Sequence, residues 1–277
     1  MPELPEVETV RRTLEPLIIN KKIKNVTVRY PKMIKKPDDA LVFSAFLENQ
    51  TFREIKRRGK FLLFILDDLE FVSHLRMEGK FGVYDDQTPL NKHTHVIFSF
   101  TDGTSLQYND VRKFGTMHLF KKGEALDRLP MKQIGVDLYL DAVDIERLYP
   151  KINKSTRAIK NILLDQQLIA GLGNIYVDET LFRAKVHPMT RGHLLTYDEV
   201  YRLLIEAEKV IHQAVKHGGT TIRSYTNGRG EMGMFQQTLY VYGQTGVPCS
   251  VCSTAIEKTK VSGRGTHYCP VCQIMNA

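Results

Sequence analysis

The chain opens with Met1-Pro-Glu-Leu-Pro-Glu-Val-Glu-Thr9, and the rest of the sequence is interpreted from this stretch. Methionine before proline is normally removed, which would leave Pro2 first in the chain with a free secondary amine. An α-amino group has a pKa of about 7.7–8, whereas a lysine amine titrates near about 10.4, so part of the Pro2 amine is unprotonated at neutral pH. Amines of this kind attack aldehyde-like carbons to form Schiff bases. The stretch therefore indicates a nucleophile at Pro2, with Glu3 beside it to move protons.

The same stretch predicts the start of a helix. Pro5 suits a first helical turn, where its missing N–H costs nothing. Glutamates suit the positive end of the helix dipole. Apolar residues then recur at helical spacing and form one face for burial: Val7, Val10, Leu14 and Leu17. Taken alone, these nine residues fit an ordinary amphipathic helix better than a catalytic end.

Composition narrows the class of protein. A length of 277 residues suggests two domains, and 42% hydrophobic residues suffice for packed cores. Thirty-nine Lys and Arg against 31 Asp and Glu give a net charge of +8, which favours polyanionic partners such as nucleic acid. The sequence has no apolar run of about 18 residues and no signal-peptide pattern at its start. We therefore expect a cytoplasmic protein without a membrane segment, and nothing indicates more than a monomer.

From Lys21 to about Phe120 the hydrophobic pattern is that of short strands. Three runs carry it best: Ile23 to Val28, Lys60 to Leu66, and His95 to Phe100, the last ending at the hairpin signal Thr101-Asp-Gly-Thr104. A further strand is expected at Phe71–His74 and a helix over Ala40 to Leu47. Strands at this regular spacing predict a β-sandwich, which we assign to residues 1–133.

From about Asp141 the period becomes helical. We expect one helix containing Ile159, Ile162, Leu163 and Ile169, a break at Gly171-Leu-Gly-Asn174, a second helix through Phe182, and a third over Tyr197 to His217. Residues 218–233 are rich in glycine and are expected to form a mobile loop, and loops of this length are commonly either functional or disordered. We assign residues 134–246 to this helical domain and residues 247–277 to a separate C-terminal module.

All four cysteines lie in the last 29 residues, in the pattern Cys249-x2-Cys252-x16-Cys269-x2-Cys272. Disulfides are rare in the cytosol, and this two-pair spacing predicts a structural Zn²⁺ held by four thiolates. A β-hairpin is expected between the pairs. Near its tip Arg264 stands between two glycines, where a guanidinium could hold a phosphate, although a solvated surface arginine fits the spacing as well.

Other basic stretches have two interpretations each. Lys60 ends the cluster Arg53 to Lys60 just before an apolar strand, so it could be held at a cleft edge rather than belong to a solvated charge run. Met77 and Phe114 stand beside arginines. They suit either core packing or insertion between base steps, as in proteins that extrude a base.

Together these pieces resemble the formamidopyrimidine-DNA glycosylase family of bacterial base-excision repair enzymes, over essentially the full length. The resemblance rests on six ordered motifs: Pro2-Glu-Leu-Pro-Glu-Val-Glu-Thr9, Arg57-Arg-Gly-Lys-Phe61, His74-Leu-Arg-Met-Glu-Gly79, Asp110-Val-Arg-Lys-Phe-Gly115, Ala170-Gly-Leu-Gly-Asn-Ile-Tyr-Val-Asp-Glu179, and the cysteine module with Gly263-Arg-Gly-Thr266. It implies an α+β fold, with an N-terminal helix on a two-layer β-sandwich, then a helix–two-turns–helix domain with a β-hairpin zinc finger. It also implies that the enzyme removes oxidised purines from duplex DNA and cleaves the resulting abasic site, at the bacterial nucleoid.

The resemblance also implies a role for individual residues. Pro2 matches the nucleophile, Glu3 its acid/base partner, Lys60 the β-elimination lysine and Arg264 the arginine assigned to δ-elimination. Residues inserted into the duplex match Met77, Arg112 and Phe114. Phosphate contacts match His74, His93 and Asn174, together with Arg264, and less distinctively Lys154 and Lys160. Arg223 and Tyr225 fall in the loop that closes over the extruded base.

Two alternatives and one departure accompany this interpretation. The sister class resembling endonuclease VIII removes oxidised pyrimidines with the same proline nucleophile, but Leu4 and the Met77, Arg112 and Phe114 set favour the purine-lesion class. A non-catalytic zinc-finger DNA-binding protein would use the same basic surface but would not need Pro2. The family's Gly-Pro-Glu-Pro turn is absent around Gly135-Val-Asp-Leu138, close to the expected interdomain linker.

Overall fold

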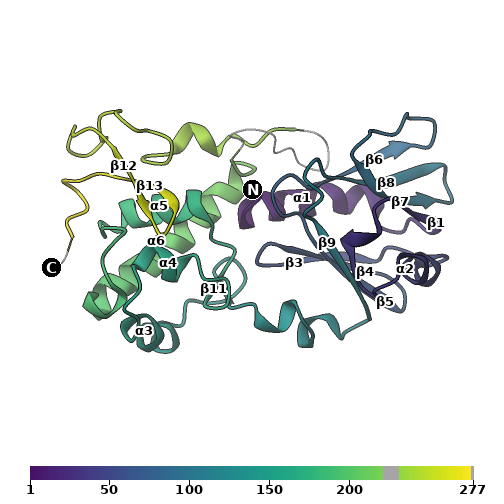
Figure 1. The fold of residues 1–277 in the computed structure, drawn as a ribbon, viewed down its shortest axis with the longest axis horizontal. Coiled ribbons are helices and arrows are strands. Elements are labelled where there is room, and N and C mark those ends of the chain that lie inside the picture. The colour runs from purple at the N-terminus through teal and green to yellow at the C-terminus, as the bar shows by residue number, and fades with distance from the viewer. Residues whose placement is uncertain (221–230, 276–277) are drawn as a thin grey trace. The chain divides into compact units, whose positions relative to one another are not determined.

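The computed structural model describes residues 1–220 and 231–275 (Figure 1). The chain divides into two compact units, Met1–Gln133 with His217–Met234, and Ile134–Lys216 with Phe235–Ala277. In this division, His217–Met234 belongs to the first unit. The sequence led us to assign this segment to the helical domain instead. Arg223 and Tyr225, expected over the extruded base, lie outside the described residues.

The first unit is a β-sandwich. One sheet has the order β2-β9-β5-β4-β3 and the other the order β1-β7-β8-β6. The strands of the first sheet are β2 (Ile34–Lys36), β9 (Thr116–Lys121), β5 (Leu69–His74), β4 (Phe61–Ile65) and β3 (Glu54–Arg58). Those of the second are β1 (Ile23–Val28), β7 (Thr94–Phe100), β8 (Thr104–Asn109) and β6 (Lys80–Asp85). All neighbouring strands are antiparallel except β2 and β9.

Aromatic rings fill the space between the sheets. The Phe71 ring of β5 stacks on Phe64 with centroids 4.5 Å apart and on Phe98 of the opposite sheet at 5.4 Å. Alternate residues of each strand face this core, which explains why the strand runs were recognisable in the sequence. The strands expected at Ile23–Val28, Lys60–Leu66, Phe71–His74 and His95–Phe100 are confirmed to within two residues.

Two helices complete the first unit (Figure 1). α1 (Leu4–Ile18) buries the predicted apolar face, with Val7, Val10 and Leu14 at most 2% exposed. α2 (Ala40–Leu47) has the predicted bounds and is preceded by Asp39, whose carboxylate caps the helix by accepting from the N–H groups of Leu41 and Val42. Short 3₁₀ turns lie at Pro31–Met33, Ala125–Asp127 and Met131–Gln133.

The second unit consists mainly of helices. They are α3 (Ile145–Asn153), α4 (Ile159–Leu163), α5 (Asn174–Arg183) and α6 (Tyr197–Lys216), with 3₁₀ turns at Gly192–Leu194 and Phe235–Thr238. A C-terminal hairpin is formed by β12 (Glu257–Val261) and β13 (Arg264–Tyr268). Among the described residues, no helix is long and apolar enough to cross a membrane.

One helix prediction was wrong. α4 ends at Leu163, and Ile169 lies instead in β11 (Ile169–Ala170), which pairs in parallel with β10 (Val136–Asp137). The helix stops because the Asp165 carboxylate accepts from the N–H of Gln167 at 3.1 Å, and such side-chain turns compete with helical bonding. β10 is the segment where the family's proline-rich turn is absent.

Candidate active site

Pro2 and Glu3 lie buried at the beginning of α1, where Glu3 is the capping residue. The Glu6 carboxylate accepts a hydrogen bond from the Glu3 N–H at 2.7 Å and a second from the Thr220 N–H, also at 2.7 Å. A side chain on Gly219 would place its Cβ 2.6 Å from Glu6, so this contact requires glycine. Glu6 therefore links the helix start to the chain just before residues 221–230. This role of Glu6 was not predicted from the sequence, although Glu3-x-x-Glu6 has capping-box spacing.

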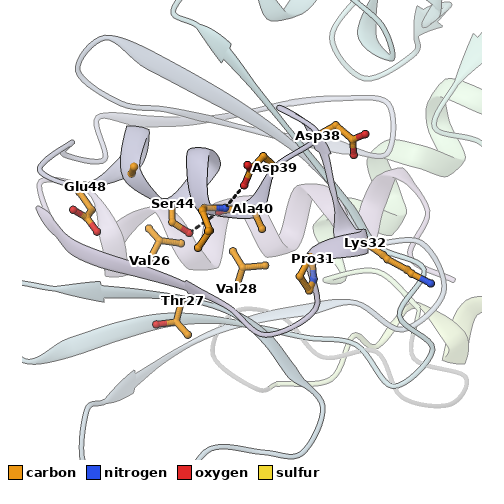
Figure 2. A pocket seen from close by; sticks show the side chains of 12 residues that line it. Val26, Thr27, Val28, Pro31, Lys32, Asp38, Asp39, Ala40, Ser44 and Glu48 are labelled. Carbon is orange, nitrogen blue, oxygen red and sulfur yellow. Dashed lines mark hydrogen bonds between the residues drawn. The ribbon is translucent and has the colours of Figure 1, made fainter.

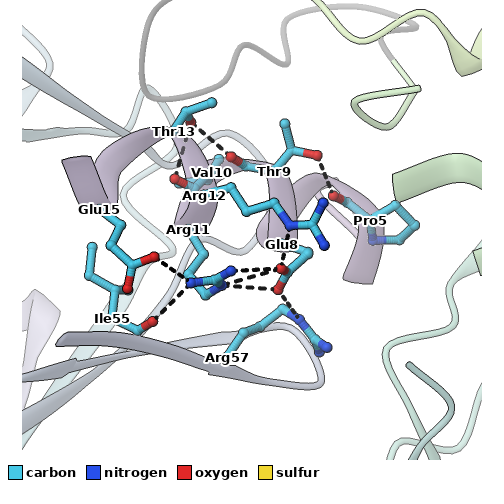
Figure 3. A network of polar contacts seen from close by, with 10 residues as sticks. All are labelled: Pro5, Glu8, Thr9, Val10, Arg11, Arg12, Thr13, Glu15, Ile55 and Arg57. Carbon is cyan, nitrogen blue, oxygen red and sulfur yellow. Dashed lines mark hydrogen bonds and ion pairs between the residues drawn. The ribbon is translucent and has the colours of Figure 1, made fainter. Parts of the chain in front are cut away.

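An ionic network centred on the buried side chains of Glu8 and Arg57 joins α1 to β3 (Figure 3). The Glu8 carboxylate lies 3.1 Å from Arg57 Nε and 2.8 Å from Arg12 Nε, and it also accepts from Arg11 at 3.0 Å. Burial alone would raise the pKa of Glu8, but hydrogen bonds from Arg11 and Arg12 and the charges of Arg11 and Arg57 outweigh it and lower that pKa. Arg57 also donates to the Gly59 carbonyl at 3.0 Å. The network therefore fixes the turn before Lys60 relative to the helix that carries Pro2.

Lys60 occupies the tight turn between β3 and β4, after Gly59 at φ +56°. Its residue exposure is only 6%, so it does not belong to a solvated charge run. Its positive charge acts on His74, which pairs with Phe61 directly across the sheet. The sandwich thus places a buried lysine beside the first of the expected phosphate-binding residues.

His74 is neutral throughout the physiological pH range. Burial first, and then the charges of Arg76 and Lys60, lower the pKa of His74 to about 3. Its Nδ1 accepts from the Arg76 N–H at 2.9 Å, so the single proton of the neutral ring lies on Nε2. Phe61 packs edge-on against the ring with centroids 4.5 Å apart. Nε2–H is therefore oriented as a neutral donor.

Met77, Arg112 and Phe114 all stand on exposed loops. Met77 is 38% exposed and Phe114 51%, so the alternative that they pack in the core is wrong. The Arg112 guanidinium lies over the Phe114 ring, 4.7 Å from its centroid. The buried Asp110 carboxylate supports this loop by accepting from the N–H groups of Arg112, Phe114 and Gly115 at 2.9–3.0 Å.

One buried tyrosine holds the two loops together. A Cβ on Gly115 would lie 1.8 Å from Tyr108 Oη, and a Cβ on Gly79 would lie 2.1 Å from the same atom. Both loops therefore end on glycine because the tyrosine hydroxyl fills the space between them. His93 lies next to this site: its carbonyl accepts from the Asp110 N–H at 3.0 Å, and its side chain is partly exposed.

In the second unit, the four cysteine sulfurs lie within 4.8 Å of one another. The Sγ atoms of Cys252 and Cys269 are 3.4 Å apart, and those of Cys249 and Cys272 are 3.9 Å apart. Tetrahedral zinc with bonds of about 2.3 Å requires sulfurs about 3.8 Å apart, so the set fits the ion. Backbone N–H groups of Val251 and Cys272 point at Cys249 Sγ and Cys269 Sγ, which suits thiolates. The module binds one structural Zn²⁺ and leaves no open position for chemistry.

Arg264 is exposed at the first position of β13, as expected for the hairpin tip. The turn before it is Ser262-Gly263, both at positive φ, which is a tight hairpin turn that matches strand twist. Asn161 of α4 donates to the Ser262 hydroxyl at 2.6 Å, and Asn174 donates to the Gly265 carbonyl at 2.9 Å. Helices α4 and α5 therefore hold the hairpin that carries Arg264.

Lys160 is not positioned to contact a DNA phosphate directly. Its side chain is fully buried, and its amine donates to Asp178 at 2.6 Å, Thr266 Oγ1 at 2.8 Å and the Gly265 carbonyl at 3.0 Å. Asp178 in turn accepts from the His267 N–H at 2.9 Å. The structure thus contradicts the expected direct phosphate contact, because the charge is enclosed by the protein. Lys154, by contrast, is exposed at the end of α3.

Comparison with known proteins agrees with this geometry. Residues 1–117 match the formamidopyrimidine-DNA glycosylase N-terminal domain, residues 134–226 the formamidopyrimidine-DNA glycosylase H2TH domain, and residues 246–274 the zinc finger found in FPG and IleRS. Formamidopyrimidine-DNA glycosylase of Shouchella clausii is 56% identical over 273 residues, and that of Bacillus anthracis is 53% identical over 273 residues. In both pairs the match covers 99% of this chain and 99% of the relative.

Solved structures give the same result. A complex between a Lactococcus lactis FPG point mutant and Fapy-dG containing DNA superposes with a TM-score of 0.93 at 43% identity, covering 99% of this chain and 100% of that one. The Lactococcus lactis enzyme with abasic-site DNA gives 0.92 at 43% identity, covering 98% and 99%. These matches extend over both units and include the cysteine module. The chain belongs to the formamidopyrimidine-DNA glycosylase family.

Proposed function

We propose that this chain excises oxidised purines from duplex DNA with Pro2 as nucleophile, and then cleaves the strand by β,δ-elimination. The family's glycosylase and abasic-site lyase activities, with double-stranded DNA as partner and one structural zinc, follow from membership. The observation that supports the residue assignment best is the buried Pro2-Glu3 start of α1, linked through the Glu8–Arg57 pair to the turn before Lys60. Bacterial relatives acting on DNA support the nucleoid as its place of action.

The first step forms one bond and breaks another. After Met1 is removed, the Pro2 nitrogen attacks C1′ of the damaged nucleotide, and the bond from C1′ to the base breaks with its electron pair leaving on the base. The proton that the amine loses after the attack neutralises the departing base. Glu3 delivers a proton to the sugar ring oxygen, so the ring opens to an iminium with Pro2. A base inside a duplex is out of reach, so the nucleotide must first be extruded.

The iminium then drives strand cleavage. It acidifies the C2′–H bond, and loss of that proton expels the 3′ phosphate; a second elimination expels the 5′ phosphate. Lys60 is proposed to assist the first elimination, since its buried amine lies within electrostatic range of His74. Arg264 is proposed for the second, because it is an exposed guanidinium at a rigid hairpin turn.

Other residues are proposed to hold the duplex. Met77, Arg112 and Phe114 would fill the space left by the extruded nucleotide, and their exposure on supported loops favours this role. His74 would donate from Nε2 to a phosphate, and His93, Asn174 and Lys154 are proposed as further phosphate contacts. Arg223 and Tyr225 stay proposals for the lesion loop. Lys160 would act through the hairpin rather than on DNA.

A second substrate class has one observation in its favour. A wild-type Lactococcus lactis FPG complex contains an oxidised-pyrimidine DNA, and this chain matches it with a TM-score of 0.91 at 42% identity. We therefore propose weaker excision of oxidised pyrimidines at the same site. The ratio of single-turnover rates on 8-oxoguanine and oxidised-pyrimidine duplexes tests this order, and a higher rate on the pyrimidine would reverse it.

The glycosylase step is tested with Glu3→Gln. This variant keeps the size of the side chain but cannot act as an acid, so it should bind an 8-oxoguanine duplex as tightly as the parent while excision falls at least about 100-fold. Excision at the parent rate would remove Glu3 from the mechanism. Glu208→Gln, on α6, is the matched control and should leave the excision rate unchanged.

A further inference from the structure

A groove lies between β1 and α2, and no residue assigned to catalysis or DNA contact lines it. It encloses about 780 Å³ and is lined on one side by Val26, Thr27 and Val28 of β1. The other side is the stripe Leu41, Ser44, Ala45 and Glu48 of α2, residues at helical spacing that share one face. Figure 2 shows Val26 and Val28 on the side of β1 that faces this helix.

On its outer side β1 bonds to Asn49 and Gln50 at Ile23, but among the described residues no backbone partner is found there at Val26 and Val28. β1 ends the sheet order β1-β7-β8-β6. The Arg29 N–H donates to the His95 carbonyl of the adjoining strand, and the register continues with Thr27 opposite Ile97. Bonded positions alternate in antiparallel pairs, so the main-chain N–H and C=O groups of Val26 and Val28 point away from β7. An extended chain could pair with these groups.

The α2 side of the groove carries an apolar side chain that is largely exposed to solvent. Leu41, which lines the groove, is 82% exposed, whereas Phe43 and Leu47 on the opposite face of α2 are fully buried. α2 therefore presents Leu41 to solvent next to Val26 and Val28, whose outer main-chain groups have no backbone partner in the described part of the chain. Exposed apolar surface of this kind marks interaction sites.

The two ends of the groove are acidic. Asp38 and Asp39 stand at the start of α2 and Glu48 at its end, against Lys32 as the one cation among the lining residues (Figure 2). The chain as a whole carries +8, so this local excess of negative charge is opposite to what DNA binding needs. It also disfavours a second copy of the chain, because pairing two such grooves would bring carboxylates together.

We propose that this groove binds an extended segment of a partner protein, which adds a strand to the edge of β1 and carries two basic residues that reach the acidic ends. Asp39 and Glu48 flank α2, so at about 1.5 Å per helical residue they stand about 13 Å apart. A strand advances about 3.3 Å per residue, so the two basic residues are about four positions apart with an apolar residue between them.

The probe is a fluorescein-labelled peptide with the sequence Gly-Thr-Lys-Thr-Val-Thr-Lys-Thr-Gly, measured by anisotropy against the full chain. Saturable binding is expected, and a Kd above about 1 mM would overturn the proposal. A peptide with both lysines replaced by glutamate should bind at least about tenfold more weakly. Equal binding of the two peptides would show that the acidic residues of the groove do not recognise basic side chains, and would overturn the proposal.

Matched protein variants locate the site. Asp38→Lys with Glu48→Lys should weaken peptide binding at least about tenfold. Asp85→Lys with Asp86→Lys makes the same change in charge on the exposed end of β6 and should have no effect. Both double variants should excise bases at the parent rate and bind duplex DNA normally. A change in DNA binding only in the first variant would make the groove part of the DNA interface and overturn the proposal.

Hydrogen exchange tests the strand pairing itself. The peptide should slow exchange of the Val28 amide, which faces the groove, and should leave the Thr27 amide unchanged because it already pairs with β7. Val28→Pro removes the outward N–H without removing a bond to β7, and should weaken peptide binding. Peptide binding without protection of Val28 would overturn strand addition. Sedimentation showing a dimer of the free chain that Val28→Pro abolishes would assign the groove to a second copy.

Discussion

Lys160 provides the sharpest test of how the second unit meets DNA. Its buried amine pairs with Asp178 at 2.6 Å and holds the hairpin through Thr266 and the Gly265 carbonyl. Lys160→Met should lower the free energy of unfolding by about 3–5 kcal/mol, since removing one partner leaves a buried charge uncompensated. Urea unfolding of the zinc-loaded protein measures this loss. A loss below about 1 kcal/mol would contradict the buried pair.

The same variant separates positioning from direct contact. Each phosphate contact contributes about 0.9 to the slope of log affinity against log salt concentration. Lys160→Met should weaken DNA binding by the same factor at every salt concentration and leave the slope unchanged, whereas Lys154→Ala should reduce the slope by about 0.9 if it contacts a phosphate. A reduced slope for Lys160→Met would restore the direct contact. If this variant does not fold, Thr266→Val removes one partner of the amine at about 1–3 kcal/mol and serves for the same measurement.

Four further perturbations test the first unit and the zinc module. Asp110→Ala removes the acceptor of three backbone N–H groups, so excision should fall with little change in the salt slope of binding; an unchanged excision rate would show that the loop needs no support. Gly115→Ala should destabilise the fold by about 1–3 kcal/mol, and adding Tyr108→Phe should recover part of that loss in thermal unfolding, because the clashing atom is the hydroxyl. The pKa of His74 is lowered to about 3, so the unfolded chain binds its proton first and stability falls as pH drops from about 6.5 toward 3; His74→Gln should flatten this loss, and an unchanged acid profile would place the titration elsewhere. Cys269→Ser should reduce zinc content, measured by metal analysis, and weaken DNA binding; unchanged binding without metal would make the finger dispensable.

Much of the fold followed from local patterns. The bounds of α2, the strand runs of the sandwich and the cysteine hairpin were predictable because period-2 burial and paired cysteine spacing are local signals. The failure at Ile169 has a physical cause: the Asp165 turn that ends α4 contains neither glycine nor proline, so no breaker was visible. The spacing of the apolar residues alone therefore predicted that the helix continues to Ile169.

The candidate reactive residues were recognisable in the sequence, but the side chains that support them were not. Pro2, Glu3 and Lys60 belong to recognisable motifs, whereas the buried pairs depend on contacts distant in sequence. Glu8 meets Arg57 49 positions away, and Lys160 meets Thr266 106 positions away. The family resemblance suggested a phosphate contact for Lys160, and only the fold shows that its charge is enclosed.

The measurement closest to the central claim is borohydride trapping on a duplex carrying 8-oxoguanine opposite cytosine, with mass spectrometry confirming that Met1 is absent. We predict a covalent adduct that maps to Pro2 and is lost when the chain is extended ahead of Pro2, because the amine becomes an amide. An adduct on Lys60, or no adduct despite tight binding and a free Pro2, would contradict the assignment of the nucleophile.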